Sequence, residues 1–142
     1  MLTLHQLEKR ISHLPADKQD VIIEIHNIVA RISPNADMRF YDYGVAYYNA
    51  SQGGTIKGGI CILSWDPKHE FTIRFGLGRF LPDPQHLLSG DQLAMRYYNL
   101  PSFEHVPWEA LSQLIKASSD FVPTLENTKI SDLTREKPRR SQ

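Results

Sequence analysis

The stretches with strand composition lie together in the middle of the chain, after two helical segments and before a third. Short turns rich in Gly, Pro, Asp and Ser separate these stretches between residues 38 and 100. Strands joined by short turns pair antiparallel, because a parallel pair needs a long crossover connection. This order predicts an α+β fold and disfavours alternating βαβ units.

Three segments carry apolar residues at three- and four-residue spacing, the pattern of an amphipathic helix. The first covers residues 4–14, the second opens at Pro15 and ends before Ser33, and the third opens at Pro107 and runs to about Val122. Proline fits the first turn of a helix, where its missing N–H would have no partner. The expected architecture has two N-terminal helices and one C-terminal helix packed on one face of a sheet.

About four strands are expected, over residues 38–49, 56–65, 71–75 and 95–100, with a single helical turn over residues 84–88. Gly44, inside the first aromatic and β-branched stretch, is expected to mark a bulge. The third strand shows a clear period of two, in which Phe71, Ile73 and Phe75 alternate with Glu70, Thr72 and Arg74. One set should therefore face a covered side and the other a wet or ligand-facing side of an antiparallel sheet.

The length of 142 residues fits one domain with its own core. We assign residues 1–122 to this domain and residues 123–142 to a disordered tail, because the tail is too polar to offset the entropy of ordering it. The chain has one cysteine and no apolar run of the roughly 20 residues that span a bilayer. A cytoplasmic protein without a membrane partner is expected.

Charge and motif content disfavour several function classes. Lys plus Arg and Asp plus Glu number 16 each, and sequence-independent binding of nucleic acid usually needs a basic excess. The six histidines form no His-x-x-x-His pair, and phosphate-loop and hydrolase signatures are missing. Cys61 has apolar neighbours and is expected to be a buried thiol and not a nucleophile. We therefore nominate no catalytic residue.

The predicted strands each carry one basic residue, and tyrosines lie between these residues in the sequence. The candidate ligand-binding set is Arg39, Lys57, Arg74, Arg96, Tyr43, Tyr47 and Tyr97. If these side chains share one face, they form a pocket for a small anion or a surface for a protein partner. The alternative is a set of isolated surface cations and ion pairs.

The second helical segment carries carboxylates on one side. Asp17, Asp20 and Glu24 recur at three- and four-residue spacing, and oxygen ligands of this kind hold hard cations. Solvation and the helix dipole explain the same residues without a metal.

The order of several short segments resembles the YdhG-like family, a group of small bacterial domains of unknown function. The resemblance spans residues 4–121 and depends on Leu14-Pro15, Tyr43-Gly44, Lys57-Gly58-Gly59-Ile60-Cys61, Phe80-Leu81-Pro82-Asp83-Pro84 and Met95-Arg96-Tyr97. It implies an α+β fold with helices on one side of an antiparallel sheet. Some members carry a frataxin-like iron-chaperone label, so the resemblance also implies iron handling, with the carboxylates of the second helix as its site.

Four hypotheses about function follow. The first is a non-enzymatic binding domain for a small anionic ligand or a protein partner. The second is intracellular iron binding or delivery, and the third is an enzyme whose site is assembled from residues far apart in the sequence. Nucleic-acid binding through an aromatic sheet face ranks last. A homo-oligomer that covers the open face is compatible with the first hypothesis.

Overall fold

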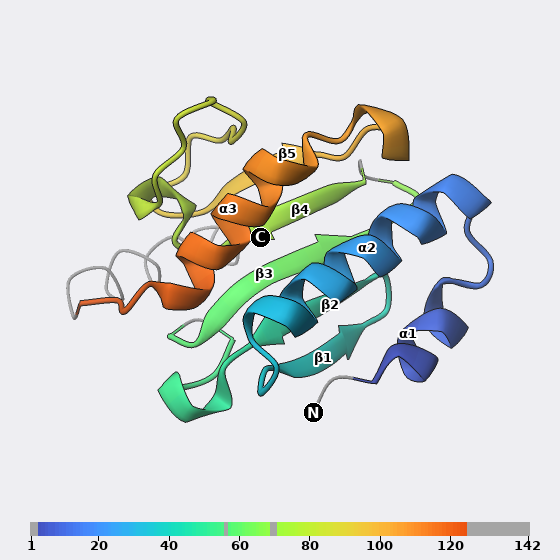
Figure 1. Cartoon of the computed structure of the whole chain (residues 1–142), viewed down its shortest axis with the longest axis horizontal. Helices are drawn as coiled ribbons and strands as arrows, with labels where there is room; N and C mark the ends of the chain where they lie inside the picture. The colour runs from blue at the N-terminus through green and yellow to red at the C-terminus, as the bar shows by residue number, and fades with distance from the viewer. Residues whose placement is uncertain (1–2, 56, 69–70, 125–142) are drawn as a thin grey trace.

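The computed structural model describes residues 3–55, 57–68 and 71–124, and these form three helices and a five-stranded antiparallel sheet (Figure 1). The helices are α1 (Leu4–Ile11), α2 (Ala16–Ile32) and α3 (Trp108–Asp120). The strands are β1 (Asp37–Tyr41), β2 (Gly44–Tyr48), β3 (Gly59–Ser64), β4 (Thr72–Phe75) and β5 (Arg96–Asn99). Their order in the sheet is their order in the chain. The predicted α+β class is confirmed.

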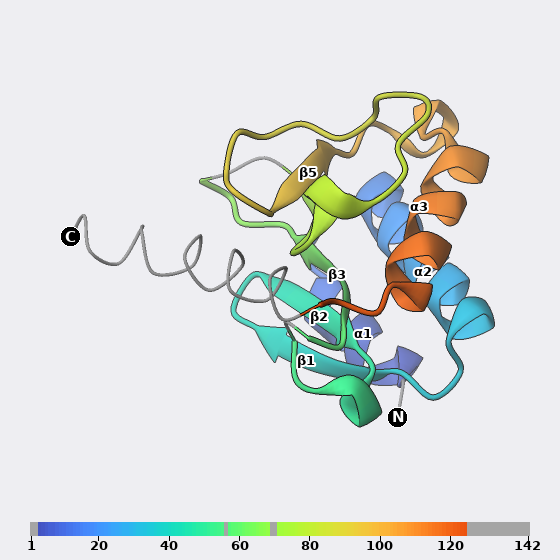
Figure 2. The same cartoon turned by 90° about the vertical axis from the view of Figure 1, so that its left-hand side faces the viewer.

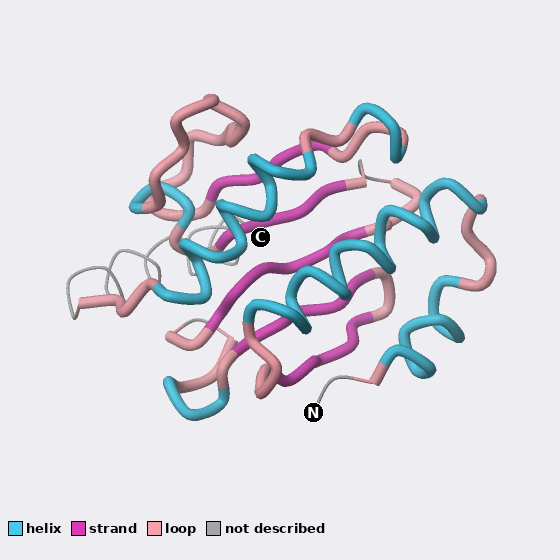
Figure 3. The backbone as a smooth tube through the Cα atoms, viewed as in Figure 1, coloured by secondary structure: helices cyan, strands magenta, loops and turns pink. Residues whose placement is uncertain are grey.

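The helices lie on one side of the sheet, and the other side carries no helix among the described residues. Figure 2 shows α2 and α3 beside the sheet seen nearly edge-on, and Figure 3 shows the strands running behind the helices. The core between the layers is apolar, and its fully buried members include Leu7, Ile11, Ile22, Ile25, Val45, Leu63, Ile73, Leu111 and Ile115. The apolar stripes of the sequence are therefore the surfaces that meet in the core.

The sheet has five strands because the segment 38–49 is a hairpin and not one strand. Asp42 and Tyr43 form its two-residue turn, and Tyr41 pairs with Gly44 across it. The side chains of Phe40 and Val45 both face the helices. The residues that face the core therefore have even numbers in β1 and odd numbers in β2. Aromatic residues continue through the turn, and this continuity hid the break in the sequence pattern.

Gly44 does not mark a bulge. It is the first residue of β2, and a Cβ atom there would lie 2.5 Å from the backbone oxygen of Leu63. Such a contact is far inside van der Waals distance, so close approach of β2 and β3 requires glycine. The irregularity in register lies instead between Tyr47 and Tyr48.

The expected helical turn over residues 84–88 does not form. The Asp83 carboxylate accepts hydrogen bonds from the N–H groups of Leu87 and Leu88, each at 2.9 Å. His86 has a φ of 54°, outside the right-handed helical region. The connection between β4 and β5 contains a short 3₁₀ helix at Gly78–Phe80 instead.

The chain after α3 is described as far as Thr124. The tail expected over residues 123–142 therefore lies almost wholly outside the described residues. Among the described helices, none has the length and apolar character that a transmembrane span requires.

Candidate binding surface on the open sheet face

The side of the sheet opposite the helices is called the open face, and pairing between strands aligns its side chains in rows. One row crosses all five strands and consists of Arg39, Ala46, Ile62, Arg74 and Tyr97. Three strand spacings of about 4.8 Å place the Cα atoms of Arg39 and Arg74 roughly 14 Å apart. Two long cationic side chains thus lie on either side of two apolar residues.

The next row, toward the β1–β2 turn, has small side chains, so the surface is hollowed there. Gly44, Ser64 and Thr72 are paired neighbours in this row. A hollow of about 620 Å³ lies over this part of the sheet, with Arg74 among its lining residues. Its other lining residues include Tyr41, Asp42, Tyr43, Gly44, Ser64 and Asp66. A volume of this size lies within the range of small-molecule sites.

Arg74 is the cation best placed for a ligand in this hollow. Its Nε is buried and has no hydrogen-bond partner, and no ion pair joins its guanidinium to a carboxylate among the described residues. Thr72, two residues earlier, is 4% exposed and its Oγ1 is also unpartnered. Buried polar groups normally have partners, and each missing partner costs about 1–3 kcal/mol. Arg74 lines the hollow, so a ligand held there would lie next to its guanidinium, whereas Thr72 is not among the lining residues.

Arg39 lies at the far side of the same row. Its guanidinium is 5.9 Å from the centre of the Tyr48 ring, which faces the same side. A contact of this kind holds the side chain against the sheet and leaves its N–H groups free to donate. Arg39 can therefore assist a ligand that extends from Arg74 over Ala46 and Ile62.

The structure brings together only part of the predicted ligand-binding set. Arg39, Arg74 and Tyr97 share the open face, and Tyr43 lies at the edge of the hollow with 48% of its surface exposed. Lys57 lies in the loop before β3, is exposed and does not line the hollow. The condition of a shared face is therefore not met by three of the seven residues, and Lys57 is the first.

Arg96 faces the other way. It pairs with Phe75, a core residue, and its guanidinium donates to the backbone oxygens of Gln92 and Met95 at 2.7 and 2.8 Å. Its stem packs against Gly78, where a Cβ atom would lie 2.7 Å from that of Arg96. Arg96 thus fixes the loop before β5.

Tyr47 is the third residue that is off the open face. It is 1% exposed in the core, and its hydroxyl lies 2.9 Å from Nδ1 of His26, which is 4% exposed. Burial lowers the pKa of His26 and raises the pKa of Tyr47. Both groups are therefore neutral near pH 7, and the His26 tautomer determines which of them donates the hydrogen bond.

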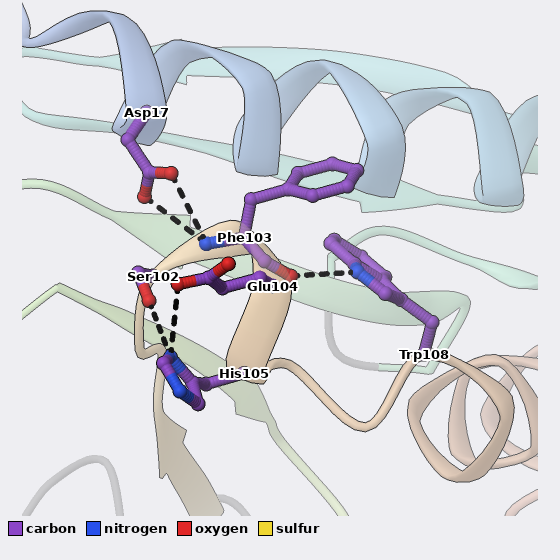
Figure 4. Close-up of polar contacts among 6 residues, drawn as sticks. All are labelled: Asp17, Ser102, Phe103, Glu104, His105 and Trp108. Carbon is purple, nitrogen blue, oxygen red and sulfur yellow. Dashed lines mark hydrogen bonds and ion pairs between the residues drawn. The ribbon is translucent and has the colours of Figure 1, made fainter.

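The carboxylates of α2 have structural contacts of their own. Asp17 accepts hydrogen bonds from the N–H of Phe103 at 3.1 and 3.3 Å, which joins α2 to the 3₁₀ helix Phe103–His105 (Figure 4). Glu24 lies 3.8 Å from Arg31, and Asp20 is exposed. Within residues 3–55, 57–68 and 71–124, no three His, Cys, Asp or Glu side chains are grouped to hold a metal ion.

One serine–histidine contact was not anticipated from the sequence. Ser102 Oγ lies 2.8 Å from His105 Nδ1, and Glu104 lies 4.0 Å from the same nitrogen (Figure 4). A catalytic triad needs the nucleophile and the carboxylate on opposite ring nitrogens. The three side chains are exposed, and Ser102 occupies the N-cap position of the short 3₁₀ helix without a side-chain capping hydrogen bond. Their geometry is that of a local surface contact and not of a catalytic triad.

Cys61 is buried in the core, as predicted, and burial raises the pKa of its thiol to about 12. Such a group is protonated near neutral pH and is a poor nucleophile.

Ser64 and Asp42 also line the hollow, and Thr72 pairs with Ser64 on the same face; none of the three belongs to the candidate set predicted from the sequence. The period-two pattern did place Thr72 beside Arg74 on the predicted ligand-facing side. Recognition of the two-residue turn Asp42–Tyr43 in the sequence would have indicated which side chains of β1 and β2 face the hollow.

No protein-family model, curated protein or solved structure matches the chain.

Proposed function

We propose that this protein is a non-enzymatic binding domain of the cytoplasm whose open sheet face holds a small anionic ligand, with Arg74 as the principal cation. The observation that supports it most is the buried Nε of Arg74, which has no hydrogen-bond partner among the described residues, in a side chain that lines a hollow of about 620 Å³. A carboxylate or phosphate oxygen would supply the missing acceptor and form a charge-assisted hydrogen bond.

The lining charges narrow the class of ligand. Arg74 is the one cation among the described residues that line the hollow, and Asp42 and Asp66 line it as well. A compact polyanion that fills the hollow would meet these carboxylates. The arrangement favours a ligand with an anionic group at Arg74. The rest of the ligand would carry hydroxyl or amino groups, whose hydrogen bonds the Asp42 carboxylate can accept.

Calorimetric titration of the full chain tests this proposal. Inorganic phosphate, succinate and glutamate are suitable first probes, because they vary the anionic group and the presence of an amino donor. Loss of a charged hydrogen bond costs about 1.5–3 kcal/mol, so Arg74→Gln is expected to weaken binding about tenfold or more. Arg39→Gln is expected to have a smaller effect.

Arg31→Gln is the matched control. Arg31 is exposed on α2, on the helical side of the protein, and pairs with Glu24. The control is expected to bind as the parent does. Equal affinity of Arg74→Gln and the parent for every probe that binds would refute the proposed site.

A further inference from the structure

A second and smaller pocket lies on the helical side of the same end of the sheet. It has a volume of about 300 Å³. Its lining residues come from the α1–α2 connection, the first turn of α2 and the β1–β2 and β3–β4 connections, and include His13, Lys18, Tyr43, Trp65, Asp66 and Phe71. Trp65 and Phe71 belong to the core cluster beneath the helices, whereas the open-face hollow lies on the other side of the sheet. Tyr43 and Asp66, at the end of the sheet between them, line both cavities.

Trp65 lines this pocket and carries an unused hydrogen-bond donor. The residue is 5% exposed, and its indole Nε1 is buried and has no acceptor within residues 3–55, 57–68 and 71–124. The other tryptophan of the chain shows the usual arrangement, because Trp108 Nε1–H donates to the backbone oxygen of Phe103 at 3.0 Å (Figure 4). Buried indole N–H groups normally have such a partner. An acceptor is therefore missing beside Trp65.

Lys18 adds a positive charge. Its ammonium nitrogen lies 5.5 Å from the centre of the Phe71 ring, and no ion pair joins it to a carboxylate in the described part of the chain. It belongs to the first turn of α2, where the helix dipole also favours an anion. The carboxylate of Asp66 accepts a hydrogen bond from the N–H of Lys68 at 2.8 Å.

The walls of the pocket are largely aromatic. Tyr43, Trp65 and Phe71 supply three rings, and three rings alone could also enclose an organic cation. Lys18 opposes a cation and favours an anion, and the carboxylate of Asp66, which also lines the pocket, already accepts the N–H of Lys68. A flat apolar body with a single carboxylate matches both the rings and the donors.

We propose that this pocket is a second ligand site, separate from the open-face hollow, for an aromatic monocarboxylate. The carboxylate lies against the ammonium group of Lys18 and accepts the Trp65 indole N–H, and the ring of the ligand packs among Tyr43, Trp65 and Phe71.

The two indole N–H signals of ¹⁵N-labelled full-length protein provide the test, with benzoate as the probe. Trp65→Phe assigns the signals. The Trp65 signal is expected to move and to saturate with benzoate, while the Trp108 signal, whose donor is already bonded, stays in place. Benzamide, which has the same shape without the charge, is expected to bind at least fivefold more weakly. No saturation of the Trp65 signal by about 10 mM benzoate, or equal movement of both signals, would overturn the proposal.

Substitutions separate this site from the open face. Lys18→Gln is expected to weaken benzoate binding about fivefold to tenfold, since a charged contact is replaced by a neutral one. Lys9→Gln, which changes an exposed lysine on α1, is the matched control. Arg74→Gln is expected to leave benzoate affinity unchanged, so either site can fail without the other. Benzoate affinity that survives Lys18→Gln intact would also overturn the proposal.

Discussion

Replacing Tyr47 by Phe removes one hydroxyl group from the core and keeps the ring. The hydroxyl lies 2.9 Å from His26 Nδ1, and the two residues are 1% and 4% exposed. The variant leaves that nitrogen buried without a partner, which costs about 1–3 kcal/mol. We therefore expect the free energy of unfolding to fall by about 2 kcal/mol, with a decrease in Tm of about 2–4 °C for each kcal/mol.

Urea unfolding at about pH 7.5, followed by circular dichroism, measures this loss. The double variant His26→Leu/Tyr47→Phe removes both hydrogen-bonding groups. It is expected to be more stable than the sum of the two single losses predicts, because it leaves no buried polar atom of the pair without a partner. If Tyr47→Phe unfolds within about 0.5 kcal/mol of the parent, the hydrogen bond does not stabilise the core as argued.

The same pair makes stability depend on pH. Burial lowers the pKa of His26 from its ordinary value of 6.5. Between the lowered pKa and 6.5, the unfolded chain binds a proton that the folded chain does not, so the free energy of unfolding decreases as the pH falls through this window. His26→Gln is expected to flatten this decrease, and His13→Gln, at an exposed position, to retain it. An unchanged slope in His26→Gln would contradict the assignment.

Three further expectations concern packing, reactivity and helix contacts. Gly44→Ala is expected to lower Tm markedly, because its Cβ would lie 2.5 Å from a backbone oxygen of β3, whereas Gly76→Ala, with no atom within 4 Å, is the harmless control. Cys61 is expected to resist iodoacetamide at neutral pH until urea unfolds the chain, since burial raises the pKa of its thiol to about 12; rapid native labelling would contradict this. Asp17→Asn is expected to weaken the acceptor of the Phe103 N–H and to speed its hydrogen exchange; an unchanged rate would refute the contact.

The sequence pattern predicts the layers of this fold well, because burial of apolar stripes determines them. The three helices, the antiparallel sheet and its single covered face all follow from spacing along the chain. The pattern fails at Asp42–Tyr43, where aromatic residues on both sides give the turn the composition of a strand. A turn of two residues changes which residues face inward, so one missed turn misplaces every later side chain of the hairpin.

The candidate site was only partly predictable for the same reason. Arg74 and Thr72 follow from the alternation in β4, but the pairing of Arg74 with Ile62 and Tyr97 depends on register, which one sequence does not specify. Tyr47 was placed among ligand residues because its type suits an exposed aromatic surface. Its partner His26 lies 21 residues away on α2, and only the packed structure brings them together.

The central claim is that Arg74 donates to an anionic ligand on the open face, and the arginine Nε–H signals of ¹⁵N-labelled protein test it most directly. Arg74→Gln assigns the relevant signal. We predict that this signal moves and saturates as a probe that binds in calorimetry is added, while the Arg31 signal stays in place. Binding of such a probe that leaves the Arg74 signal unmoved, or that moves it and the Arg31 signal alike without saturation, would contradict the account.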